Sequence, residues 1–373
     1  MGTRSVNKGL TAGMDKIGFL ARAIINQAAV VCDFCLRTNW SRPFLVLIEP
    51  TLRCPMSCKF CDLPNDWAFP RECELSLEQW VDILRGLKKW SSLVREIYVS
   101  GGEPFYRPDM MDLLERAHQI GIATRLSTIG AFCSKVLCDR LLLSPVKWLK
   151  FSIHSANPAV HDDLVGRPVF ERAIEAIRYL KARGYSGNIG ILTTVYEGNV
   201  RELGDIVRLA QRLGVESVFF RPLFGNTTAA RVFDRPALPD PSCRIRETSI
   251  LQAAVEELKE MRQYGMPVAN TDEQLDLVVK QSLGLNEGVS GCKMMYESIY
   301  IHPDGTVEIC GHMSLGLVGN VAQRPVGEVL SSSESYRVRH SVSRTCRCQG
   351  NAFVRKTFRD KVSTVLDILR PPR

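Results

Sequence analysis

The chain has 373 residues, of which 45% are hydrophobic, and a formal net charge of +8. This length and composition suffice for one large core, with or without a smaller second unit. We find no uninterrupted run of about 18 apolar residues and no signal-peptide pattern, so neither a membrane span nor secretion is expected. The expected location is the cytoplasm, where thiols stay reduced, and thirteen cysteines there suggest metal binding rather than disulfides.

The N-terminal unit, residues 1–43, is predicted to be a single amphipathic helix over about 10–37. Its expected apolar side consists of Ile17, Leu20, Ile24, Ile25 and Val31. Cys32 and Cys35 form a C-x-x-C pair on this helix, where burial in the core is the default expectation for cysteine.

Residues 44–225 show a repeating alternation of strand and helix patterns. The expected strands cover 44–49, 95–100, 122–128, 147–153, 187–195 and 216–222. The expected helices cover 76–89, where Ser76 and Gln79 form a capping box, and 108–119, 134–143, 168–183 and 199–213. Such alternation predicts an α/β fold with a parallel sheet, here a partial (β/α)6 TIM-like barrel, whose site lies at the C-terminal ends of the strands.

The pattern changes after residue 225. We expect a linker and helices over 226–290, a small unit with a β-hairpin and helices over 291–350, and a basic C-terminal helix over 351–373. Residues 336–373 hold ten Lys or Arg against two Asp, which accounts for the whole net charge. This is typical of a solvated basic helix. It also fits an anionic partner, including peripheral contact with a membrane, whereas no recognisable nucleic-acid-binding module is present.

The loop after the first strand carries three cysteines, Cys54, Cys58 and Cys61, at i, i+4 and i+7. Three thiolates on one loop can converge on an iron–sulfur cluster and leave its fourth iron open to a substrate. Spacing alone leaves a zinc site or three buried cysteines as alternatives.

With the aromatic Phe60 just before the last cysteine, this motif resembles the signature of the radical S-adenosylmethionine superfamily. The resemblance implies a 4Fe–4S cluster whose open iron is chelated by S-adenosylmethionine. Reductive cleavage would give a 5′-deoxyadenosyl radical that removes hydrogen from an unactivated C–H bond. It also implies a flavodoxin- or ferredoxin-type electron donor.

Further positions at strand ends match the family over roughly residues 44–225. Gly101, Gly102, Glu103 and Pro104 follow the second strand; in relatives this motif holds the methionine amino group, and its glycines permit close approach to a ligand. Ser127 and Thr128 end the third strand, where relatives bind ribose or carboxylate. The chain continues with Ile129-Gly130 where relatives often have Asn-Gly, so that an asparagine contact is lost.

Three more candidates stand at the ends of the fourth and sixth strands. Ser152 and His154 share one strand face, and His154 fits either a packing role or a contact with substrate or cofactor. Arg221 could pair with the methionine carboxylate or form a surface ion pair. Candidates for a substrate acid or base are Tyr98, Tyr106, His154, His302 and His312.

The second cysteine cluster comprises Cys292, Cys310, Cys346 and Cys348. Cys292 and Cys310 flank a hairpin signal that ends at Gly305, which is similar to the opening of SPASM or twitch auxiliary-cluster domains. This resemblance implies a second 4Fe–4S cluster with four thiolates, or with three and an open iron. The other cysteines, Cys73, Cys133, Cys138 and Cys243, show no ligand spacing.

These features predict an oxygen-sensitive radical S-adenosylmethionine enzyme, an oxidoreductase or isomerase. The expected substrate is a small natural-product or lipid-like molecule, because the segment before the first strand is too short for a separate leader-peptide-binding domain. The expected reaction is dehydrogenation, with the auxiliary cluster accepting an electron, or epimerisation. The alternatives are modification of a peptide or protein and a non-catalytic iron–sulfur electron carrier.

Overall fold

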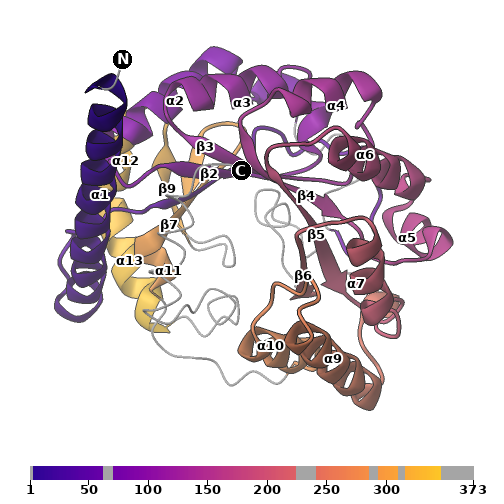
Figure 1. Ribbon diagram of the computed structural model, residues 1–373. Coiled ribbons are helices and arrows are strands. Elements are labelled where there is room, and N and C mark those ends of the chain that lie inside the picture. Colours follow the sequence, from indigo (N-terminus) through magenta and orange to yellow (C-terminus); the bar gives the residue numbers. More distant parts are fainter. Residues whose placement is uncertain (1–2, 62–69, 224–240, 285–292, 310–315, 346–373) are drawn as a thin grey trace.

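The computed structural model describes residues 3–61, 70–223, 241–284, 293–309 and 316–345, with side chains for those that lie within 18–341. Its centre is a sheet of nine strands in the order β6-β5-β4-β3-β2-β1-β7-β8-β9 (Figure 1). The strands are β1 (Leu45–Ile48), β2 (Glu96–Val99), β3 (Ala123–Thr128), β4 (Val146–Ser152), β5 (Asn188–Val195), β6 (Ser217–Pro222), β7 (Ser298–Ile301), β8 (Thr306–Glu308) and β9 (Leu317–Asn320). Strands β1 to β6 are parallel, which confirms the predicted partial barrel.

Helices cover the outer face of the curved sheet (Figure 1). They are α2 (Leu77–Trp90), α3 (Met110–Gln119), α4 (Lys135–Leu142), α5 (Pro158–Val165), α6 (Phe170–Ala182) and α7 (Leu203–Arg212). All of them except α5 bury apolar residues against the sheet in one large core, whereas Leu164 and Val165 of α5 belong to two smaller apolar clusters. The predicted capping box of Ser76 and Gln79 begins α2. Helix α5 is an addition, because the sequence analysis placed no element between β4 and α6.

The predicted hairpin is present, since β7 and β8 pair antiparallel and Gly305 takes a φ of +84° in the turn between them. However, β7 also pairs in parallel with β1 over its whole length. The hairpin and β9 therefore extend the barrel sheet. Periodicity within a segment does not specify its pairing with a strand about 250 residues earlier, so the sequence could not reveal this continuity.

Two helices from the region 226–290 close the far side of the sheet. Helix α9 (Thr248–Gln263) packs on α7 and on α10 (Asp272–Ser282), and α10 packs on β6. The amide of Asn270 exchanges two hydrogen bonds with the Phe220 backbone, at 2.7 and 2.8 Å, which fixes α10 to β6.

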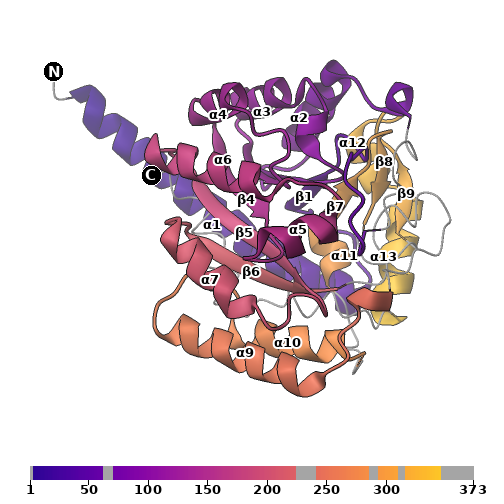
Figure 2. The ribbon, with the colours of Figure 1, turned by 90° about the vertical axis from the view of Figure 1, so that its right-hand side faces the viewer.

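The N-terminal helix α1 (Thr3–Leu36) is longer than predicted and projects from the body (Figure 2). The predicted apolar side is wrong for Ile24, Ile25 and Val31, which are exposed, and Cys35 is exposed as well. The expectation that no segment could cross a membrane was too strict. Gly18–Leu36 is long and apolar enough by length and composition, although Arg22 and Asp33 interrupt it.

The described C-terminal part holds helix α11 (Met294–Glu297) before β7, and helices α12 (Val326–Leu330) and α13 (Ser333–Thr345) after β9. Arg339 of α13 was counted with a solvated basic face, but it is 1% exposed and donates to Asn39 at 3.4 Å. The predicted basic helix over 351–373 lies outside the described residues, and the domain limits remain predictions.

Candidate functional site

The candidate residues of the barrel meet at one edge of the sheet. Because β1 to β6 are parallel, their C-terminal ends lie along the same edge, in the order of the sheet. The cysteine loop follows β1, and the Gly-Gly-Glu-Pro motif follows β2. Thr128, His154 and Arg221 stand at the ends of β3, β4 and β6. The structure therefore brings together residues that the sequence analysis assigned to one site.

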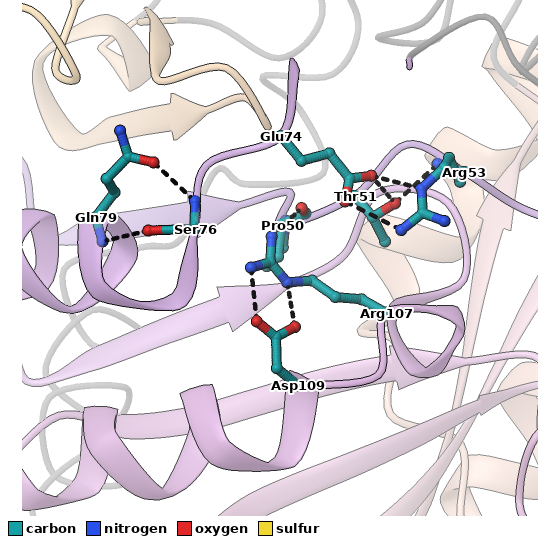
Figure 3. A network of polar contacts seen from close by, with 8 residues as sticks. All are labelled: Pro50, Thr51, Arg53, Glu74, Ser76, Gln79, Arg107 and Asp109. Atoms are coloured by element: carbon teal, nitrogen blue, oxygen red, sulfur yellow. Dashed lines mark hydrogen bonds and ion pairs between the residues drawn. The ribbon is translucent and has the colours of Figure 1, made fainter. Parts of the chain in front are cut away.

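Two arginines with little exposure anchor the start of the cysteine loop (Figure 3). The Arg53 guanidinium pairs with both carboxylate oxygens of Glu74, at 2.8 and 3.1 Å. Arg107 pairs with Asp109 at 2.6 and 2.9 Å and donates to the carbonyl of Pro50 at 3.0 Å. Bidentate pairs with low exposure fix geometry as well as charge, so the first half of the loop is anchored before the cysteines begin.

The glycines after β2 make a close contact within the protein in addition to the expected approach to a ligand. A Cβ on Gly101 would lie 2.3 Å from the carbonyl oxygen of Thr51, and one on Gly102 would lie 2.3 Å from that of Arg53. The Gly102 amide donates to Thr51 at 3.0 Å. These glycines therefore allow the motif to approach the backbone of the cysteine loop itself, rather than only a ligand.

The Glu103 carboxylate faces the end of β3. It is 1% exposed and accepts hydrogen bonds from the Thr128 hydroxyl at 2.7 Å, the Ile129 amide at 2.8 Å and the Phe105 amide at 3.1 Å. Burial raises the pKa of Glu103 to about 7, although these three donors act against the shift. Glu103 thus links two strand ends, and both carboxylate oxygens already have partners in the protein.

Helix α5 supports the middle of the cysteine loop. The amides of Ser57 and Lys59 donate to the carbonyls of Val165 and Leu164, at 3.1 and 2.9 Å. Gly166 follows at a φ of +75°, and a Cβ there would lie 2.2 Å from the Ser57 hydroxyl. The sequence analysis missed this support, although Asn157 before Pro158 and a glycine after Val165 are ordinary helix start and stop signals.

The three loop cysteines are half-buried. Burial raises the pKa of Cys54 to about 12. Burial together with the neighbouring Cys61 and Cys54 thiols raises the pKa of Cys58 well above its ordinary value. Thiolates this close together repel one another and need a positive charge beside them. Bound iron would supply that charge, and a thiol that coordinates a metal is deprotonated.

The donor set fits an iron–sulfur cluster. Zinc would need its ligands around one point, and within the described ranges no three His, Cys, Asp or Glu side chains are so arranged. A four-iron cluster instead takes one thiolate per iron. Cys54, Cys58 and Cys61 would hold three irons, while Met56 and Val165 belong to the apolar cluster behind Cys54 and Cys58.

His154 is 3% exposed and is held by hydrogen bonds. Its Nδ1 accepts from the Thr194 amide at 3.2 Å, so the proton of the neutral ring is assigned to Nε2. Burial, with smaller effects of His161 and Arg221, lowers the pKa of His154 well below its ordinary value. Phe60 packs edge-on against the ring at 5.0 Å. His154 therefore packs behind the aromatic residue of the cysteine motif.

Arg221 lies beside the thiols. Its Nε donates to the Thr194 hydroxyl at 3.0 Å. Burial lowers the pKa of Arg221, and the nearby Cys61 and Cys58 act in the opposite direction. This position is compatible with the predicted carboxylate contact, and the role of Arg221 stays a prediction. Ser127 and Ser152 are half-buried on the same sheet edge.

Cys292, Cys310, Cys346 and Cys348 lie outside the described residues, as does His312. Met294 and Ile309 are described residues next to Cys292 and Cys310 in the chain. They lie close to one another, since the Ser298 hydroxyl donates to the carbonyl of Met294 at 2.9 Å and to that of Ile309 at 3.4 Å. The segments that lead to Cys292 and Cys310 therefore meet at β7, which agrees with a shared cluster.

The remaining acid–base candidates occupy distinct environments. His302 is 2% exposed, with Nδ1 2.9 Å from Glu49 and Nε2 3.3 Å from Glu308. Tyr98 and Tyr106 each lie against an arginine, Arg125 and Arg53, with 5.3 Å between guanidinium carbon and ring centre. In this structure, His302 joins strands and has no exposed ring nitrogen to offer a substrate.

Family models match two parts of the chain. Residues 48–220 match the radical SAM superfamily, and residues 292–349 match an iron–sulfur cluster-binding domain, SPASM. A curated relative, PqqA peptide cyclase from Streptomyces rochei, is 34% identical over 176 residues, which are 47% of each protein. The chain thus spans about half the length of this relative.

Solved structures share the fold. The crystal structure of Streptococcus suis SuiB bound to S-adenosylmethionine superposes with a TM-score of 0.63 at 17% identity, covering 80% of this chain and 68% of SuiB. SuiB bound to the precursor peptide SuiA gives the same TM-score and identity, with 85% and 71% covered. The chain therefore belongs to the radical SAM superfamily and carries a C-terminal SPASM-type domain, with a 4Fe–4S cluster, S-adenosylmethionine and an auxiliary cluster as its cofactors.

Proposed function

We propose that this enzyme modifies a peptide, by removing hydrogen from a side chain and forming a new covalent bond within the peptide. The observation that carries this proposal is the 34% identity to a peptide cyclase over 176 residues. The SuiB structure with a precursor peptide adds support at the level of the fold. The small-molecule substrate, which the sequence analysis ranked first, has no such support and becomes the second candidate.

The residues at the sheet edge have definite tasks in this proposal. Cys54, Cys58 and Cys61 hold the cluster, and Arg221 and the Gly-Gly-Glu-Pro motif hold S-adenosylmethionine. A reduced 4Fe–4S cluster held there would supply one electron for cleavage of S-adenosylmethionine into methionine and a 5′-deoxyadenosyl radical. The chain must then keep water out and hold the target carbon close, a role that suits the apolar side chains of Phe60, Met56 and Ile129 near the loop.

Bond formation leaves one electron to be removed. The peptide loses two hydrogen atoms in this reaction. The 5′-deoxyadenosyl radical takes up the first, and the second leaves as a proton and an electron. Cys292, Cys310, Cys346 and Cys348 would hold an auxiliary cluster, which would supply an acceptor for this electron. A flavodoxin- or ferredoxin-type protein is the proposed donor to the first cluster.

The test is an anaerobic assay of the iron-loaded enzyme with dithionite and short peptides encoded beside its gene. We expect 5′-deoxyadenosine and a peptide lighter by two hydrogen atoms. Cys58→Ala should abolish 5′-deoxyadenosine, and Cys310→Ala should retain its formation without peptide product. Cys73→Ala, at an exposed cysteine without ligand spacing, is the matched control. Cleavage that no peptide stimulates but a small molecule does would overturn the peptide proposal, and a fully loaded enzyme without cleavage would favour an electron carrier.

A further inference from the structure

Helix α1 exposes large apolar side chains along its C-terminal half and buries two polar ones beside the apolar Phe19 and Val30, which are 2% and 1% exposed. The polar side chains of Asn26 and Asp33 face the body of the protein and are 6% and 0% exposed. The apolar side chains of Ile24, Ile25 and Leu36 face outward and are 54%, 68% and 69% exposed. A helix on the surface of a globular protein normally has the opposite arrangement.

Hydrogen bonds fix this orientation. The Asn26 amide donates to the carbonyl of Arg42 at 3.0 Å and accepts from its backbone amide at 2.7 Å. The Asp33 carboxylate accepts from the hydroxyl of Thr38 and from the backbone amides of Trp40 and Ser41, at 2.6 to 2.8 Å. Rotating α1 to bury its isoleucines would leave these buried groups without partners, which costs more than the apolar burial recovers.

The outward residues form one continuous surface, which we call the outward stripe. Its members follow the i, i+3 and i+4 spacing of one helix face and are Ala21, Ile24, Ile25, Ala28, Val31, Cys35 and Leu36. Fifteen residues of helix rise about 22 Å, so the stripe is comparable in size to the apolar face of an interfacial helix. Figure 1 shows α1 along one edge of the body, and Figure 2 shows that its N-terminal part extends beyond the body.

The charges around the stripe favour an anionic lipid surface as its occupant. Arg22 and Arg37 are exposed at its two ends, whereas Asp33, the acidic residue in this part of α1, is buried. Trp40 follows and is 65% exposed. Arginine and tryptophan beside an apolar face suit the headgroup level of a bilayer, and the net charge of +8 acts in the same direction.

We propose that α1 seats this enzyme on a lipid membrane, with the outward stripe in the upper acyl layer and Arg22, Arg37 and Trp40 among the headgroups. Although Gly18–Leu36 is long enough to span a bilayer, Asn26 and Asp33 remain hydrogen-bonded to the protein, so the helix lies along the interface. The proposal is independent of the substrate assigned above.

The test is co-sedimentation of the iron-loaded full chain with vesicles of phosphatidylcholine and phosphatidylglycerol. The native protein should pellet with the vesicles, and Ile24→Glu with Val31→Glu should lower the partition coefficient at least about tenfold, because two charges enter the apolar layer. The matched control is Val136→Glu with Leu143→Glu, two apolar residues of the α4 region that are 73% and 90% exposed. It carries the same charge change and should bind as the native protein does.

Circular dichroism and iron content should be equal for all three proteins. Native protein that stays in the supernatant would overturn the proposal, as would equal losses in both double variants. A dimer of the native chain without vesicle binding, which Ile24→Glu with Val31→Glu converts to a monomer, would instead assign the outward stripe to a second copy of the chain.

Discussion

The Nδ1 atom of His302 lies 2.9 Å from Oε2 of Glu49, a residue 253 positions earlier in the chain. Glu49 follows β1 and leads into the cysteine loop, whereas His302 follows β7 and leads into the hairpin before Cys310. With Glu308 on the other side of the imidazole, the three side chains form a buried charged triad. This triad and the β1–β7 pairing connect the two regions that bear the cluster cysteines.

Replacing His302 by glutamine should destabilise the protein by about 3 kcal/mol, because two buried carboxylates would lose the charge between them. Urea unfolding measures this change. Glu308→Gln should cost less, since a neutral pair of Glu49 and His302 remains. Arg201→Gln removes an exposed ion pair with Glu247 and should change stability by about 0.5 kcal/mol or less. Equal effects of His302→Gln and Arg201→Gln would contradict a stabilising role of the triad.

The same triad predicts a pH dependence. Burial alone would lower the pKa of His302, but hydrogen bonds to Glu308 and Glu49 outweigh it and raise the pKa to about 10, from an ordinary 6.5. A raised histidine pKa stabilises the folded state fully below the unfolded value and less as pH rises through the folded one. The stability difference between the native protein and His302→Gln should therefore shrink between pH 6.5 and 10. A constant difference over this range would show that His302 is neutral in the fold.

Gly102→Ala should displace the cysteine loop. The new Cβ would lie 2.3 Å from the Arg53 carbonyl and 2.7 Å from that of Leu52, and backbone atoms cannot yield as a flexible side chain can. We expect a loss of about 1–3 kcal/mol and a lower iron content per chain. The matched control is Gly86→Ala within α2, where the nearest atom is 3.5 Å away and alanine should stabilise the helix. Normal iron loading of Gly102→Ala would mean that the loop tolerates the shift.

The sequence predicted the barrel and the place of its site, because repeated hydrophobic patterns and strand-end motifs are local signals. The sequence placed Glu103 beside the cysteine loop but could not show that its carboxylate accepts hydrogen bonds from Thr128 and Ile129. Such contacts depend on which side chains meet when two strands align. The pairing of β7 with β1 depends on the same long-range information.

Two other features of the fold differ from the sequence-based prediction, because the local pattern and the tertiary environment disagree there. The apolar residues of α1 predicted a buried face that included Ile24, Ile25 and Val31. The structure instead buries Asn26 and Asp33, whose partners lie in the segment after the helix, next to Phe19 and Val30. Helix α5 was absent from the prediction because its eight residues are short for a periodic signal. Its cap signals, Asn157 and Gly166, were the available clues.

Arg221 should contribute to binding of S-adenosylmethionine through its charge and its planar guanidinium. If it pairs with the methionine carboxylate, Arg221→Gln should weaken binding roughly 10- to 100-fold, the usual cost of a lost charged hydrogen bond. The affinity of Arg221→Lys should fall between those of the native protein and Arg221→Gln, because lysine keeps the charge without the bidentate geometry. Thr194→Val removes the acceptor of the Arg221 Nε proton and should have a smaller effect.

Anaerobic equilibrium dialysis of the iron-loaded proteins measures these affinities, and iron content is determined on the same samples. Unchanged affinity in Arg221→Gln at full iron loading would refute the carboxylate contact. If Arg221→Gln has a lower iron content and Arg221→Lys has the native content, the positive charge at this position stabilises the cluster thiolates. Cys58 and Cys61 lie beside this guanidinium. The two readouts thus separate a residue that binds S-adenosylmethionine from one that stabilises the cluster loop.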